Sequence, residues 1–142
     1  MPALAACSGS SKPEEARLTQ QQFVERANQV CIRSDRRVFR IGNLTTDPTG
    51  WSQTVDAAER GIEEMARLRP PANRQRGFDA MLATARKLKD ALADVRDALA
   101  DRKYARAQKA QRRATTFDTS IKKQASRLGL TFCEQLLTNW PA

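Results

Sequence analysis

Three cysteines are the residues of this 142-residue chain whose chemistry is best specified by the sequence. Histidine is absent, so the commonest general base and metal ligand is missing. The sequence also contains no C-x-x-C, no G-x-S-x-G and no phosphate-binding glycine loop. We therefore predict no catalytic residue, no metal site and no cofactor, and we interpret the chain as a protein that is not an enzyme.

Cys7 ends the stretch Leu4-Ala5-Ala6-Cys7, which matches the bacterial lipobox. In that motif an aliphatic and two small residues precede the cysteine that is acylated and becomes the new N-terminus. The polar residues that follow, SGSSKPEE, are typical of a flexible tether between a lipid anchor and a folded domain. Residues 1–18 are therefore predicted to be a lipobox remnant and tether, with Cys7 as the lipidation site.

The stretch before Cys7 is short for this motif. A signal peptide has a basic start and an apolar core of about 7 to 15 residues, whereas only residues 1–6 precede Cys7. Two interpretations stay open: the true start lies upstream and most of the signal is missing, or the match is accidental.

Cys31 and Cys133 would remain as a pair if Cys7 is lipidated. We expect them to form a disulfide after export, since disulfides persist in oxidising compartments. Closing a loop of about a hundred residues would stabilise the fold by roughly 4 to 5 kcal/mol in the chain-entropy model. The alternative is two buried, reduced thiols in a cytosolic protein.

The elements that must position these cysteines are helices, because helix formers dominate and apolar residues recur at steps of three and four. The clearest example is a heptad pattern formed by Phe78, Met81, Ala85, Leu88, Leu92, Val95 and Leu99. A lone helix with such an apolar face is not stable in water, so other helices must cover it. Residues 19–142 are predicted to form one all-α domain, an up-down four-helix bundle with a short C-terminal helix closed by one disulfide.

Local signals predict the helix ends. Thr19 and Gln22 have the spacing of a capping box, and Gly42 ends the first helix. Residues 44–50 are expected to form a surface loop, residues 51–69 the second helix, and the third helix ends at residue 100 or 101.

Asp101 is expected to cap the fourth helix. The expected apolar face of that helix is Tyr104, Ala107, Ala110, Ala114, Phe117, Ile121, Ala125 and Leu128. Gly129 is expected in the left-handed conformation with Leu130 as its hydrophobic contact, before a last helix that reaches residue 137 or 138 and contains Cys133.

The net charge of +9 comes from 25 Lys and Arg against 16 Asp and Glu. Much of the excess falls in two helices, where the candidate binding residues for an anionic partner are Arg33, Arg36, Arg37, Arg40, Arg102, Arg106, Lys109 and Arg113. Anionic lipid head groups and acidic cell-wall polymers are the partners we expect, and a merely solubilising surface is the alternative.

The aspartates at 90, 94, 97 and 101 share one helix face, which we interpret as solvated surface rather than a cation site.

The arrangement resembles the short envelope lipoproteins and secreted helical bundles of actinobacteria. The residues that carry the resemblance are Val30-Cys31 in the first helix, the L-x-P-P turn at 68–71 and the L-G-L-x-x-C ending at 128–133. It covers residues 23–133 and implies an extracytoplasmic helical bundle with one disulfide and no assigned activity. This chain departs from the group because it lacks the apolar core of a signal and a glycine between the third and fourth helices.

We therefore expect a non-catalytic lipoprotein, anchored to the bacterial cell membrane on its outer side or secreted, that acts as a helical interaction module at the cell envelope. A protein partner there is also open. The alternative is a cytosolic basic bundle that binds nucleic acid, which a pI near 10.2 suits. Nucleic acid is disfavoured because aromatic residues are not interleaved with the basic ones.

Overall fold

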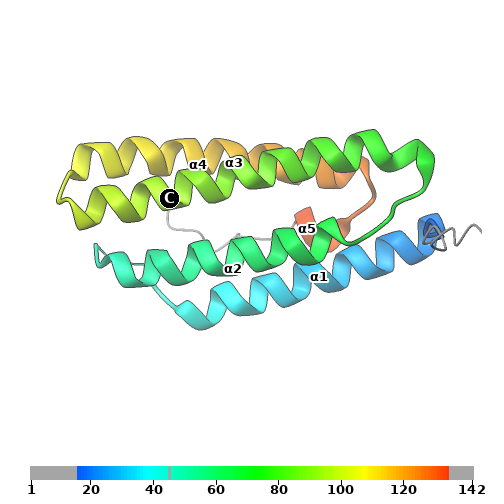
Figure 1. Cartoon of the computed structure of the whole chain (residues 1–142), viewed down its shortest axis with the longest axis horizontal. Coiled ribbons are helices and arrows are strands. Elements are labelled where there is room, and N and C mark those ends of the chain that lie inside the picture. Colours follow the sequence, from blue (N-terminus) through cyan, green and yellow to red (C-terminus); the bar gives the residue numbers. More distant parts are fainter. Residues whose placement is uncertain (1–15, 45, 135–142) are drawn as a thin grey trace, which may run out of the picture.

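The computed structural model of the chain describes residues 16–44 and 46–134. Its helices are α1 (Gln20–Ile41), α2 (Pro48–Ala66), α3 (Gln75–Ala100), α4 (Tyr104–Arg127) and α5 (Thr131–Glu134), with a short 3-10 turn, η1 (Ala72–Arg74). Figure 1 shows α1 and α2 in one layer and α3 and α4 in the other. The described residues contain no strand, and the predicted all-α bundle is confirmed.

α1 begins and ends where the sequence predicts. Thr19 Oγ1 accepts a hydrogen bond from Gln22 N at 3.2 Å, and Gln22 Oε1 accepts one from Thr19 N at 3.0 Å. This reciprocal pair is the expected capping box. Gly42 follows the last residue of α1 with a φ of 77°, a conformation that glycine adopts without strain.

α2 begins at Pro48, so the prediction of a loop over residues 44–50 was wrong for its last three residues. Asp47 Oδ1 accepts a hydrogen bond from Thr49 N at 3.1 Å, and Pro48 takes the first helical position. Asp at the N-cap followed by Pro is a helix start that resembles a turn in sequence. α2 also ends earlier than expected, at Ala66, because the chain turns before the two prolines.

The turn between α3 and α4 contradicts the prediction that Asp101 caps α4. Lys103 N donates to Ala98 O at 2.7 Å and Arg102 N donates to Leu99 O at 3.0 Å. These two bonds form a Schellman motif that ends α3, and they place Asp101 at its C-terminal cap. Arg102 takes the left-handed position with a φ of 56°, where a glycine is usual.

The end of α4 uses the same motif with the usual residue. Gly129 N donates to Ser126 O at 2.9 Å, and Leu130 N donates to Ala125 O at 3.0 Å. Gly129 has a φ of 77°, and Leu130 is fully buried. The predicted left-handed glycine with its hydrophobic contact is confirmed.

Two apolar clusters fill the bundle. The first contains the edge-to-face pair of Phe23 and Phe78, whose ring centroids lie 5.3 Å apart, together with residues of α1 to α5. The second lies toward the α3–α4 turn, and its buried members are Trp51, Val55, Leu88, Ala91, Leu92, Val95, Ala98, Ala107, Ala110 and Ala114. None of these buried members belongs to α1, and Cys31 is the last residue of α1 among the buried members of the first cluster.

The predicted apolar faces are confirmed at most positions. In α3 the residues Phe78, Met81, Leu88, Leu92 and Val95 are buried, and the other two members of the heptad pattern are partly buried. Tyr104 of α4 was wrongly assigned to the core: its side chain is 55% exposed, because it is the first residue of its helix and projects beyond the second cluster.

Candidate functional site

Among the described helices, α1 and α4 are the neighbours in the bundle that do not pack on each other. α1 packs on α2, α2 on α3 and α3 on α4, but in the described part of the chain no Cα atom of α1 lies within 8 Å of α4. Of the helices that the structure describes, only the short α5 contacts both of them. We call the side of the molecule between α1 and α4 the open seam.

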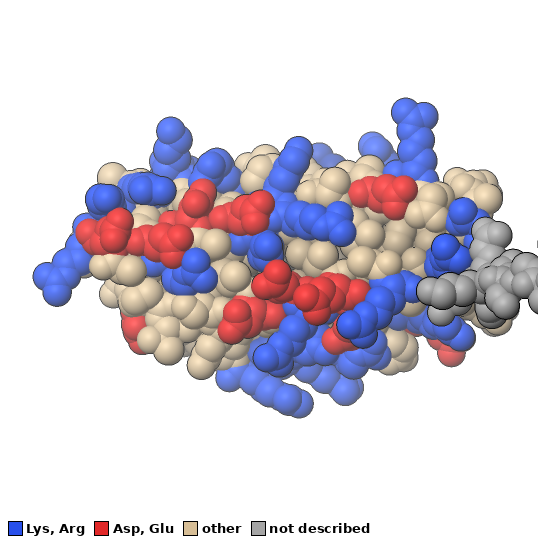
Figure 2. Space-filling model, viewed as in Figure 1, with Lys and Arg blue, Asp and Glu red and all other residues tan. Residues whose placement is uncertain are grey.

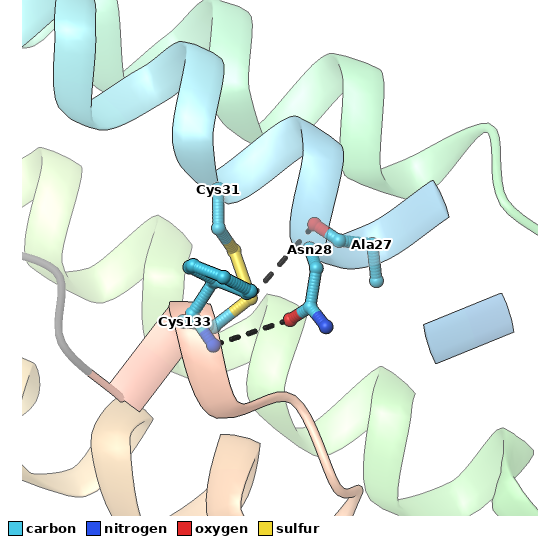
Figure 3. Close-up of a disulfide and its surroundings, with 5 residues drawn as sticks. Ala27, Asn28, Cys31 and Cys133 are labelled. Atoms are coloured by element: carbon cyan, nitrogen blue, oxygen red, sulfur yellow. Dashed lines mark hydrogen bonds between the residues drawn. A yellow bond between two sulfur atoms is a disulfide. The ribbon is translucent and has the colours of Figure 1, made fainter. Parts of the chain in front are cut away.

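The disulfide closes one end of the open seam by joining α1 to α5 (Figure 3). The sulfur atoms of Cys31 and Cys133 lie 2.03 Å apart and their Cα atoms 5.3 Å apart, and both residues are buried. Asn28 Oδ1 accepts a hydrogen bond from Phe132 N at 3.3 Å. Cys133 Sγ lies 3.9 Å from Ala27 O, a packing contact because a disulfide sulfur carries no proton. The predicted pairing is confirmed.

An apolar cavity of about 140 Å³ lies inside the bundle beside this disulfide. Both cysteines line it, and its largest wall residues are Val30, Met65, Met81, Leu82, Leu88 and Leu92. α1 and α4 contribute the two edges of the open seam, with Val38 on one side and Ile121 on the other. Residues of all five α-helices thus line the cavity.

Small residues account for the empty space. Ala57, Ala58 and Gly61 of α2 and Ala85 of α3 stand in the wall, where larger side chains would fill the cavity. Gly61 is needed for a second reason: a Cβ at this position would lie 2.6 Å from Ser34 Oγ of α1. The small residues of α2 therefore explain both the close approach of α1 and the empty space of the cavity.

Few polar groups line the cavity, and two of them are already bonded within the protein. Thr54 Oγ1 donates to Gly50 O at 2.9 Å within α2. Asp118, on the α4 edge, pairs with Lys122 at 2.8 Å, and Asp35, on the α1 edge, is exposed. The interior suits an uncharged apolar group, as do apolar cavities of about 150 Å³ that bind benzene or xenon in other proteins.

The basic residues predicted on α1 are partly engaged within the protein. Arg33 Nε donates to Glu64 Oε2 of α2 at 3.0 Å, and Arg37 pairs with the other carboxylate oxygen. Burial raises the pKa of Glu64, but the hydrogen bonds and charges of Arg37 and Arg33 outweigh it and hold the pKa below its ordinary value. Arg36 and Arg40 are exposed.

The basic residues predicted on α4 are mostly exposed. Arg113 pairs with Asp94 of α3, while Arg106 and Lys109 are exposed, as is Arg102 in the turn. Figure 2 shows acidic and basic side chains interspersed over the face that it displays. The structure therefore does not join the two predicted groups into one continuous basic surface, since α1 and α4 are not in contact.

The two basic groups nevertheless lie at the same end of the bundle. α1 ends and α4 begins at this end, at the left of Figure 1, so Arg40 and Arg102 both lie there. The first residues of α1, to which the predicted tether is joined, lie at the opposite end. Cys7 itself and the rest of the predicted tether before residue 16 lie outside the described residues.

The aspartates on the outer face of α3 are solvated, as predicted. The side chains of Asp90, Asp94, Asp97 and Asp101 are between 41% and 73% exposed. A hydrogen bond from Arg96 lowers the pKa of Asp97, against a smaller opposing effect of burial. Among the described residues, no three Cys, Asp or Glu side chains are grouped so that they can hold a metal ion.

The cavity and its small-residue wall were not predicted from the sequence. The signal available was the run Ala57, Ala58 and Gly61 on the face of α2 that also carries Met65. Such a run is equally typical of closely packed helices, so the empty space was not predictable from it. No described helix has the length and apolar character needed to cross a bilayer.

No protein-family model, curated protein or solved structure matches this chain. Only the geometry and chemistry of its own residues therefore bear on its function.

Proposed function

We propose that this protein is a non-catalytic helical binding module that binds an uncharged aliphatic group in the cavity at the open seam. It is exported and held at the outer face of the bacterial cytoplasmic membrane by a lipid on Cys7. The observation that carries the proposal is the cavity itself: about 140 Å³ of apolar space lined by residues of all five α-helices. Burying a bound alkyl group there is favourable because it leaves water without any loss of hydrogen bonds.

The disulfide supports the extracytoplasmic part of the proposal. Such bonds are rare in the reducing cytosol and common in exported proteins. Cys31 and Cys133 are 102 residues apart in the chain, and their bond is buried in the first apolar cluster. A bond in this position acts as a structural link between two distant helices.

A series of linear alcohols from 1-butanol to 1-octanol tests the binding function. Each added methylene should raise the affinity about fourfold, from roughly 0.8 kcal/mol per buried methylene, until the cavity is full. Isothermal titration measures this dependence on chain length. The hydroxyl of the alcohol is expected to lie near Asp35, which lines the cavity and is exposed.

A matched pair of α3 variants provides the control. Ala85→Leu places a larger side chain in the cavity wall and should abolish alcohol binding. Ala83→Leu adds the same side chain at an exposed position two residues away and should leave binding unchanged. Equal binding by both variants, or no dependence on chain length, contradicts the proposed site.

The membrane anchor is tested separately by intact mass measurement on protein from the membrane fraction. The expected result is a diacylglyceryl and acyl modification of Cys7, and Cys7→Ser should release the protein into the soluble fraction. An unmodified chain that is soluble in both forms contradicts the anchor and leaves the cavity function unaffected.

The exposed cations are proposed to bind anionic lipid head groups or acidic wall polymers. Arg106→Glu with Lys109→Glu should weaken binding to vesicles of phosphatidylglycerol at low salt, because these side chains are exposed on α4. Arg86→Glu with Lys87→Glu makes the same charge change at exposed positions of α3. An equal loss of binding in both double variants indicates a non-specific effect of net charge.

Nucleic-acid binding is the alternative function, and the disulfide and the interspersed acidic side chains count against it. A DNA affinity that falls steeply with salt, in a chain whose cysteines are reduced in vivo, would favour it over the envelope function.

A further inference from the structure

The second half of α1 is less deeply packed than the first. Among the described helices, only α2 and α5 have Cα atoms within 8 Å of α1. Beyond Cys31, every residue of α1 is partly buried or exposed. This half of the helix therefore presents a large part of its surface to solvent.

Phe39 is the most exposed large apolar residue of the described chain, with 78% of its surface exposed. At 100° per residue, Ile32 and Arg36 project within about 60° of Phe39 on the same side of α1. Ile32 and Phe39 belong to neither apolar cluster of the bundle. We call Ile32, Arg36, Phe39 and Arg40 the outer face of α1.

The charges around Phe39 are mostly positive. Residues 33–41 contain four arginines and one aspartate. Two of the arginines, at 33 and 37, pair with Glu64 of α2. Arg36 and Arg40 are exposed, as is Asp35. Two exposed guanidinium groups thus lie next to an exposed phenyl ring.

This combination has the chemistry of a surface that lies on an anionic bilayer. Guanidinium groups bind lipid phosphates, and an aromatic ring between them enters the boundary between head groups and acyl chains. A soluble acidic polymer would contact the arginines alone, since it offers no apolar phase to the ring. The exposed ring of Phe39 therefore favours a bilayer over a polymer.

We propose that the outer face of α1 lies on a bilayer that contains anionic lipids, with the ring of Phe39 inserted among the acyl chains. The inference rests on the proposed function, in which a lipid on Cys7 holds the protein at a membrane and exposed cations bind its head groups. It names the face that meets the bilayer. Ile32 and Phe39 lie about 10 Å apart along the helix, so α1 is oriented parallel to the membrane surface.

The first test removes the ring. Every chain is full-length and carries Cys7→Ser, so that no lipid anchors it, and flotation measures its binding at low salt to vesicles of equal parts phosphatidylglycerol and phosphatidylcholine. Phe39→Ser is compared with Tyr104→Ser, which removes another exposed ring at the start of α4. Far-UV circular dichroism verifies that each variant retains the helical bundle.

The second test reverses the charges. Arg36→Glu with Arg40→Glu is compared with Lys123→Glu and Arg127→Glu on α4. Both pairs are exposed, both are spaced four residues apart, and each includes an arginine in the last turn of its helix. The two double variants therefore have the same net charge and differ in which face of the molecule is altered.

Phe39→Ser should weaken vesicle binding by about fivefold or more, because the ring no longer leaves water, and Tyr104→Ser should change it by less than about twofold. The Arg36, Arg40 variant should lose about tenfold or more, and its control less than about threefold. Phe39→Trp should also acquire a blue-shifted emission on addition of the same vesicles, since the indole enters an apolar phase.

Equal losses in Phe39→Ser and Tyr104→Ser, or no loss in either, overturn the proposal. So does binding that depends on Arg36 and Arg40 but not on Phe39 and that soluble polyphosphate reproduces, since the partner would then be an acidic polymer. A loss confined to the Arg106, Lys109 variant places the lipid contact on α4 and overturns only this inference. The intact mass of Cys7 and the alcohol titration test the anchor and the cavity independently of these outcomes.

Discussion

The interface between α3 and α4 and the open seam between α4 and α1 differ in whether their helices touch. α3 and α4 pack along their length, with alanines on both sides: Ala91 and Ala98 face Ala107, Ala110 and Ala114 in one buried cluster. On its other side α4 does not contact α1 among the described residues, and Ile121 and Val38, which both line the cavity, are only partly buried.

This difference shows two ways of joining helices in one small bundle. Because alanine side chains are small, α3 and α4 lie close enough for continuous contact. The α3–α4 interface is therefore stabilised by many small contacts, and a larger side chain there would be destabilising. The open seam has space to spare and depends on a single covalent link through α5.

The largest effect is expected from breaking the covalent link of the open seam. Cys31→Ala with Cys133→Ala should lower the free energy of unfolding by about 4 to 5 kcal/mol, because the unfolded chain loses a closed loop of about a hundred residues. Urea unfolding measures the change, and the unsubstituted protein in dithiothreitol should show the same loss. A loss below about 1 kcal/mol indicates that α5 remains in place by packing alone.

Substituting leucine for alanine at two positions of α3 compares the α3–α4 interface with the cavity wall. Ala98 is fully buried in the α3–α4 cluster, so Ala98→Leu should destabilise the protein by about 1 to 3 kcal/mol through overpacking. Ala85 lines the cavity, so Ala85→Leu should stabilise by about 0.5 to 2 kcal/mol. If both substitutions destabilise equally in urea unfolding, the cavity is not open space in solution.

Smaller changes in stability are expected from substituting the left-handed residue of each Schellman motif. Arg102 holds a left-handed φ of 56° at the α3–α4 turn, so Arg102→Gly should stabilise by about 0.5 to 1 kcal/mol. Gly129 holds the equivalent place beside the open seam, and Gly129→Ala should cost about 1 kcal/mol. A Cβ there would meet only Val24 at 4.0 Å, so the cost is conformational. Thermal unfolding resolves both changes, and opposite signs are the expected result.

The smallest effect is a pH dependence from the ion pairs that attach α1 to α2. The pKa of Glu64 is lower in the folded protein than its ordinary value of 4.5, so its stabilising contribution is present above that pH and is lost as the pH falls below it. Glu64→Gln should therefore be destabilising at pH 7 by less than about 1 kcal/mol, and the difference from the parent should vanish in acid. Glu63→Gln, at an exposed neighbouring position, is the control, and urea unfolding at pH 3 and pH 7 is the measurement.

Local sequence signals predicted most of the fold. The capping box at Thr19, the heptad pattern from Phe78 and the left-handed glycine at 129 each depend on residues within a few positions, and each is confirmed. The Cys31–Cys133 pair was predicted because these two cysteines remain if Cys7 is lipidated, although no local sequence signal links them. The errors at residues 48–50 and at Asp101 come from motifs that are ambiguous locally, where Asp-Pro resembles a turn and Asp before a helix resembles a cap.

The candidate site was not predictable in the same way. Apolar periodicity indicates which face of α1 or α4 is buried, but it does not say against which helix. The gap between Val38 and Ile121 depends on how closely α1 packs on α2, and this distance is set by Gly61 against Ser34. A cavity is a property of the distances between helices, and those distances result from the whole set of contacts.

The disulfide also has a consequence for a chain that has been cut. Cys31 and Cys133 enclose every connection between α1 and α5 in one covalent ring. A protease of tryptic specificity that cleaves the exposed turn after Arg102 would produce two pieces that stay bonded to each other until a reductant separates them. One cut in any loop of this ring would leave a nicked molecule that is still a single covalent unit and can still hold its helices together.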